Sequence, residues 1–218
     1  MQIKIDLKIL IFLLIFHFTN QIKTYILLMI FACIHELGHL LIGLILGFKP
    51  TSIEIKPIGF SVIFLNSIED YNNKVLKGNV LEVKKILVYL AGPLINIFLA
   101  IIIYFINIKG TIGLQLIYIN FLIAFFNLLP IYPLDGGRIV KSVTCLFYGL
   151  LSSYKITDKI SWIVTIMVFA ASSILVLKVH NYGLVLIIGY LLYVRICNSR
   201  LIQWRIRLLE TIQKKNRQ

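Results

Sequence analysis

Residues 24–47, TYILLMIFACIHELGHLLIGLILG, form an apolar run that also holds two histidines and a glutamate. A run of about 20 apolar residues is long enough to cross the bilayer as a helix. Ionisable side chains at bilayer depth are costly, and as a rule they face the protein interior at a functional site. The stretch therefore predicts a transmembrane helix that carries a functional site.

The composition of the chain is that of a membrane protein. Of its 218 residues 59% are hydrophobic and 14% are charged, whereas a soluble domain has roughly 45–50% and about 25%. Its apolar segments are too long and too uniform for barrel strands, so we expect an all-α polytopic membrane protein. About six transmembrane helices are predicted, at residues 7–20, 24–47, 86–107, 112–132, 160–178 and 182–198. A shorter apolar piece, residues 139–151, is expected to continue the fourth span or to lie beside it.

The distribution of basic residues predicts the orientation. With six spans, only Lys23, Lys109 and Lys178 of the 22 Lys and Arg residues fall on the side opposite the termini. The positive-inside rule then places both termini in the cytoplasm, and this orientation accounts for the net charge of +13 without nucleic acid. The first span also resembles a signal peptide, but no small-residue cleavage site follows it, which favours a retained helix.

The predicted domains are a transmembrane domain at residues 1–198, with its motifs within 24–150, and a basic cytoplasmic tail at 199–218. The tail suits an anionic membrane surface, or it is a solvated helix end. The three cysteines, Cys33, Cys145 and Cys197, show no paired spacing and are expected to be packing residues.

The segment between residues 48 and 85 is the one sizeable insertion. Residues 51–66 alternate and are rich in Val, Ile and Phe, which predicts a small β-hairpin turning near residues 57–59. An edge strand at residues 51–64 could bind another chain. Residues 67–83 have the pattern of a surface helix. An ordinary connecting loop is the alternative for both pieces.

The spacing His35-Glu36-Leu37-Gly38-His39 has the pattern of a zinc hydrolase. Histidines at i and i+4 lie on one helix face and can bind one Zn²⁺, while the glutamate beside them can take a proton from water made acidic by the metal. The alternative, two buried histidines that serve only packing, would leave three titratable groups in the membrane without a function. The spacing therefore indicates an HExxH zinc metalloendopeptidase.

A catalytic zinc site needs a third protein ligand. The other acidic residues lie in polar segments or at span ends, which leaves Asp135 in NLLPIYPLDGGRI, residues 127–139. Pro130 and Pro133 are expected to end the fourth span so that Asp135 turns toward the histidines. A plain cytoplasmic turn is the alternative for this segment.

HELGH at residues 35–39, followed by N-x-x-P-x-x-P-L-D-G-G at 127–137, resembles the site-2 protease family of intramembrane zinc metalloproteases. The resemblance covers residues 24–150. It implies that His35, His39 and Asp135 bind zinc and that Glu36 is the catalytic base. It further implies that Asn127 contacts substrate or stabilises the oxyanion, a role suited to an amide donor.

Within that family, AGPLIN at residues 91–96, a span before HELGH and no inserted PDZ domain resemble the sporulation branch. That branch includes the protease that processes pro-sigma-K, which implies a bacterial cytoplasmic membrane, in that setting one that surrounds the forespore. Such proteases often carry a nucleotide-sensing CBS domain, and none is expected here, so ATP regulation is not implied. Asn96 is expected to line the site or, as is commoner in membranes, to hydrogen-bond between helices.

The resulting hypothesis is an intramembrane zinc protease that cuts a membrane-embedded or membrane-associated protein. Its partners would be that substrate, the lipid bilayer and a membrane inhibitor or gating protein. Two other classes fit less well. A metal-ion transporter would also hold His, Glu and Asp in the membrane, and a catalytically silent client-binding protein would be expected to lack a ligand or the base.

Overall fold

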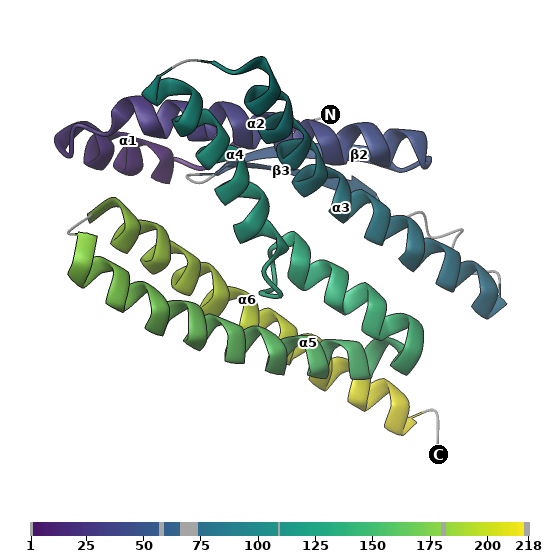
Figure 1. Ribbon diagram of the computed structural model, residues 1–218. Coiled ribbons are helices and arrows are strands. Elements are labelled where there is room, and N and C mark those ends of the chain that lie inside the picture. The colour runs from purple at the N-terminus through teal and green to yellow at the C-terminus, as the bar shows by residue number, and fades with distance from the viewer. Residues whose placement is uncertain (1, 57–58, 66–73, 109, 180–181, 216–218) are drawn as a thin grey trace. The chain divides into compact units, whose positions relative to one another are not determined.

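The computed structural model describes residues 2–56, 59–65, 74–108, 110–179 and 182–215. The chain divides into two compact units, residues 1–127 and 128–218, and each is described by itself (Figure 1). Six helices and one small sheet form within the described residues. This confirms the predicted fold class, a mostly helical membrane protein with a small β insertion.

Among the described residues, the helices that are long and apolar enough to cross a membrane lie in the first unit. They are α2 (Ile22–Ile45), the part Asn79–Ile106 of α3 (Lys74–Ile106), and α4 (Thr111–Leu128). They correspond to the second, third and fourth predicted spans.

Helix α1 (Lys8–Phe18) is apolar but has only 11 residues, or about 16 Å at 1.5 Å per residue, which is too short to cross the bilayer. The first predicted span is therefore a short helix. It is followed directly by α2, and the rings of Phe16 and Tyr25 stack with centroids 4.8 Å apart.

The predicted hairpin forms, and a third strand joins it. β2 (Lys49–Lys56) and β3 (Gly59–Leu65) pair antiparallel, while β1 (Gln2–Ile5) pairs parallel with the other side of β2. The order is β1-β2-β3, so β2 is central over the residues that β1 covers. β1 was not predicted, because four residues ahead of an apolar run carry too little pattern. β1 covers residues 52–55 of β2, so that part of the predicted edge at 51–64 is closed, while β3 forms an edge of the described sheet.

The sheet packs on α2 through β3 (Figure 1). A Cβ at Gly43 would lie 2.5 Å from the Phe64 ring, so the glycine leaves the space that this ring of β3 fills against α2. The predicted surface helix is different in kind: its residues 74–83 are the first turns of α3, continuous with the third span. The remainder, residues 67–73, lies outside the described residues.

The second unit consists of α5 (Asp135–Val179) and α6 (Tyr182–Lys215), which lie side by side (Figure 1). α5 is broken at Gly149, whose φ of 78° is favourable only for glycine. Residues 139–151 form the part of α5 around Gly149 and before it, so they do not continue α4 as one helix. The alternative that they lie beside the fourth span stays a prediction. The fifth and sixth predicted spans lie in α5 and α6, and residues 180–181 between them fall outside the described part.

A buried ion pair joins the two helices of this unit. Arg195 of α6 is 1% exposed, and its Nη2 lies 2.6 Å from Oδ1 of Asp158 in α5. The guanidinium also lies 5.0 Å from the ring centroid of Trp162. Because a buried charge is stable only when it is paired, these contacts fix α6 on α5.

Candidate metal centre

The two predicted histidine ligands lie together in α2. His35 and His39 are both buried, and their Nε2 atoms are 3.2 Å apart. Two nitrogens bound to one tetrahedral Zn²⁺ at about 2.0–2.1 Å would be about 3.3 Å apart. The pair of imidazoles therefore fits a shared zinc ion.

The second ring nitrogen of His39 is held by α3. Its Nδ1 lies 2.7 Å from the backbone carbonyl oxygen of Val88. Because a carbonyl only accepts hydrogen bonds, Nδ1 carries the proton and Nε2 keeps the lone pair that a metal needs. No sequence motif could have identified Val88, since a backbone carbonyl 49 residues away has no residue signature.

Gly92 of α3 leaves the space in front of both imidazoles. A Cβ at this position would lie 2.4 Å from Nε2 of His39 and 2.6 Å from Nε2 of His35. Any larger residue would therefore occupy the place where the ring nitrogens converge. Gly92 lies in the segment AGPLIN, residues 91–96, in which only the asparagine was predicted to have a role.

Asn96 lies one turn further along α3 and is fully buried. Neither its Oδ1 nor its Nδ2 has a hydrogen-bond partner among the described residues. The interhelical hydrogen bond expected as one reading of Asn96 is therefore not found in that part of the chain. A buried amide without partners is rare and calls for an explanation.

Glu36 is tied to the sheet. The backbone N–H of Val62 in β3 donates a hydrogen bond to its Oε2 at 3.1 Å. The candidate base thus lies next to His35 in sequence and against the β3 strand in space.

Asn127 and Asp135 fall on either side of the boundary between the units. The Nδ2 of Asn127 donates to the carbonyl oxygen of Ile123, one turn back in α4, at 3.0 Å. An amide has a second N–H, so this bond leaves a donor for the predicted oxyanion role. Asp135 is the first residue of α5, where the helix dipole favours a carboxylate, and its Oδ1 lies 4.0 Å from Nη1 of Arg138.

The turn before Asp135 is held by its own unit. The Ser161 hydroxyl accepts a hydrogen bond from the N–H of Tyr132 at 2.9 Å, and it lies 3.3 Å from the carbonyl oxygen of Pro130. A Cβ at Gly137 would lie 2.3 Å from the backbone nitrogen of Tyr132 in this turn, and one at Gly136 would lie 2.1 Å from the carbonyl oxygen of Leu128, just before it. Asp135 therefore follows a turn whose path only glycines permit. Of the predicted site residues, the structure brings His35, Glu36 and His39 together within the first unit.

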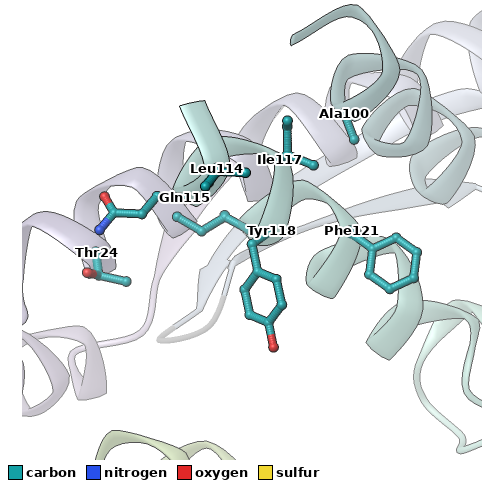
Figure 2. Close-up of a pocket in the computed structure, with 8 residues that line it drawn as sticks. Thr24, Ala100, Leu114, Gln115, Ile117, Tyr118 and Phe121 are labelled. Atoms are coloured by element: carbon teal, nitrogen blue, oxygen red, sulfur yellow. The ribbon is translucent and has the colours of Figure 1, made fainter. Parts of the chain in front are cut away.

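A pocket elsewhere in the first unit is separate from this chemistry. An open cavity of ≈ 540 Å³ is lined by α2, α3 and α4, with Thr24, Gln115 and Tyr118 among its residues (Figure 2). Thr24 precedes His35 by 11 positions in α2, or about 16 Å along the helix. The lining contains none of the predicted ligands or the base, so the cavity is not the candidate metal centre.

Comparisons with known proteins agree with this chemistry. Residues 111–171 match the sequence profile of peptidase family M50. A zinc metalloprotease of Methanocaldococcus jannaschii is 32% identical over 62% of this chain and 38% of its own length. Stage IV sporulation protein FB of Bacillus subtilis is 29% identical over 56% of this chain and 40% of its own length. The chain thus spans about two fifths of these relatives.

A solved structure shares the fold. The site-2 protease from Methanocaldococcus jannaschii aligns over 88% of this chain and 87% of its own, with a TM-score of 0.65 and 24% sequence identity. Two of the relatives in sequence are zinc metalloproteases by name, and zinc is the metal of the M50 family. The donor set around His35 and His39 fits that metal.

Proposed function

We propose that this chain, a member of peptidase family M50 with a site-2 protease domain, is a zinc-dependent intramembrane protease. Its substrate would be a membrane-embedded or membrane-associated protein. The observation that carries the proposal is the convergence of two buried imidazole nitrogens 3.2 Å apart, in front of a glycine that leaves the space open.

In this proposal His35, His39 and Asp135 hold the zinc. When bound, the ion would supply a Lewis acid and make a water molecule acidic near neutral pH. The N–H···O contact between His39 and Val88 orients the imidazole and raises its basicity as a ligand. Asp135 brings the negative charge that two neutral imidazoles lack.

Glu36 is the proposed general base. Its carboxylate takes the proton from the attacking water and delivers it to the leaving amine nitrogen. The amide N–H of Asn127 donates to the oxyanion that develops on the scissile carbonyl. The scissile segment must be unwound for this attack, and pairing with the β3 edge would hold it extended.

The proposal also covers the substrate, the orientation in the membrane and a partner protein. The similarity to a sporulation protein of Bacillus subtilis supports a sporulation sigma-factor precursor as the first substrate to test. The basic residue distribution supports cytoplasmic termini in a bacterial cytoplasmic membrane. A membrane protein that inhibits or gates the site is proposed as a further partner.

The experiment is cleavage of epitope-tagged membrane proteins, pro-sigma-K among them, by the purified chain in proteoliposomes. We expect cleavage that a zinc chelator stops and that added zinc restores. Glu36→Gln should abolish cleavage while leaving the zinc content of the purified protein unchanged.

The matched control is Glu210→Gln, which removes a carboxylate that pairs with Lys155 on the surface and should leave cleavage intact. Chelator-insensitive cleavage, or full activity of Glu36→Gln, would contradict the proposal. Transport of Zn²⁺ into the vesicles without proteolysis would point to a metal transporter instead.

A further inference from the structure

The hydrogen bond between Glu36 and β3 lies on the outer edge of the sheet. Val62 is opposite Ile53 in the β2–β3 register, and its N–H donates to Glu36 of α2. In an antiparallel pair, alternate residues of an edge strand direct their N–H and C=O groups away from the neighbouring strand. The carboxylate of Glu36 therefore occupies an outward hydrogen-bonding position of β3.

An added strand would need that same position. An extended peptide joins a sheet by accepting hydrogen bonds from the outward N–H groups of the edge strand. The Val62 N–H is a single donor, and a strong, linear hydrogen bond uses it completely. The Glu36 carboxylate and a peptide strand that pairs across Val62 thus compete for the same N–H donor.

We propose that the N–H of Val62 exchanges partners when substrate binds. In the substrate-free protein it holds the Glu36 carboxylate, and in the complex it donates to a carbonyl oxygen of the substrate strand. Pairing of the substrate then frees the Glu36 oxygen to accept the proton of the attacking water. The inference rests on the proposed function, because the role of Glu36 as base and the pairing of substrate with β3 both belong to it.

This exchange would make the base respond to the conformation of the substrate. A helical segment satisfies its own carbonyl groups and cannot accept from the Val62 N–H, whereas an unwound segment can. Val62 would thus be a positioning residue that acts through its backbone. Only an extended substrate would release the base.

Two variants of Glu36 separate this exchange from the loss of the base. Glu36→Gln and Glu36→Ala both lack the carboxylate, but glutamine keeps an oxygen that can accept from Val62 and alanine does not. The probe is a fluorescein-labelled hexapeptide of alternating valine and threonine. Its binding to chelator-treated protein is measured by fluorescence anisotropy, so neither zinc nor turnover contributes. We expect Glu36→Ala to bind the probe about fivefold more tightly than Glu36→Gln does. This ratio is the equivalent of ~1 kcal/mol for one hydrogen bond.

Variants of Val62 locate the effect at its N–H. Proline is tolerated on an edge strand where the lost N–H faces away from the sheet, so Val62→Pro removes the contested donor without breaking the β2 ladder. In the Val62→Pro background, Glu36→Ala should give no gain in binding. In the Val62→Ala background, which keeps the N–H, the fivefold difference should persist.

Amide hydrogen exchange gives a readout without any ligand. The Val62 amide should exchange faster in Glu36→Ala than in Glu36→Gln, and the probe peptide should slow it in both. Equal exchange rates in the two variants would mean that the Glu36 oxygen does not hold this N–H, and the proposal would be overturned.

Equal binding of the probe by the two Glu36 variants, or no binding by either, would also overturn the partner exchange. Zinc-dependent cleavage that Glu36→Gln abolishes would still uphold the proposed function in that case. If the two Glu36 variants differ fivefold in probe binding but the wild-type protein cleaves nothing, the proposed protease function would be contradicted. The β3 edge would then be a peptide-binding site without cleavage.

Discussion

The histidine half and the aspartate half of the proposed zinc site are held in place by different means. His35 and His39 take their geometry from residues distant in the chain, since Val88 orients one ring and Gly92 clears the space before both. Asp135 takes its position from the turn that directly precedes it and from Ser161, all within its own unit.

This difference shows two ways of preorganising a ligand. The histidine half depends on α3 packing against α2, so it is sensitive to any change of side-chain volume in that contact. The aspartate half depends on backbone path, so it is sensitive to changes in the glycines and in the hydrogen bonds of the turn.

The largest expected effect is at Asp135. If it is the third zinc ligand, Asp135→Ala should lower cleavage at least about a thousandfold, because residues that act as one catalytic unit fail together. Zinc affinity, measured by competition with a chromogenic chelator, should fall as well. Wild-type zinc affinity in Asp135→Ala would show that the histidine half binds zinc without it and that the third ligand lies elsewhere.

Gly92→Ala tests the histidine half. The added Cβ would lie 2.4 Å from a ligand nitrogen, so we expect the purified protein to lose most of its zinc and cleavage to fall by about a hundredfold. Metal content by mass spectrometry checks this. Gly189→Ala is the matched control, since a Cβ there meets nothing within 4 Å, and it should keep its zinc and gain slightly in helix stability.

Ser161→Ala tests the aspartate half more gently. It removes the hydroxyl that accepts from Tyr132 and contacts Pro130, a loss of about 1–2 kcal/mol. We expect cleavage to fall up to about tenfold at unchanged zinc stoichiometry, since the turn loosens but every ligand remains. Ser172→Ala removes a hydroxyl that donates to the carbonyl oxygen of Phe169 in the same helix, and it should leave cleavage unchanged. Equal activity of the two variants would mean that the turn before Asp135 keeps its position without the Ser161 hydrogen bond.

The smallest effect is expected at Asn96. Replacing a buried amide that has no partner among the described residues with leucine should raise the melting temperature by about 2–4 °C. Cleavage should fall severalfold, because an amide kept in such a position is expected to serve the site. Thermal unfolding in detergent and the cleavage assay check both. A stabilised variant with full activity would make Asn96 a packing residue.

Much of the fold could be predicted because long runs of hydrophobic residues predict membrane helices directly. The runs at 24–47, 86–107 and 112–132 became α2, part of α3 and α4, and the alternation at 51–66 became β2 and β3. The prediction of a span at 7–20 was wrong, because apolar composition does not reveal that a helix ends after 11 residues. β1 was missed because four residues give no measurable period.

The sequence by itself determined which residues are proposed to carry the chemistry. Helix geometry places His35, Glu36 and His39 on neighbouring positions of one helix, and the pattern of prolines and glycines around Asp135 predicts a turn, because both signals are local. Only the tertiary structure decided that Val88 orients His39, that Gly92 clears the space before the imidazoles, and that the Val62 N–H holds Glu36. These three contacts use a carbonyl, a missing side chain and a backbone N–H, and none of these has a residue signature that a sequence pattern could carry.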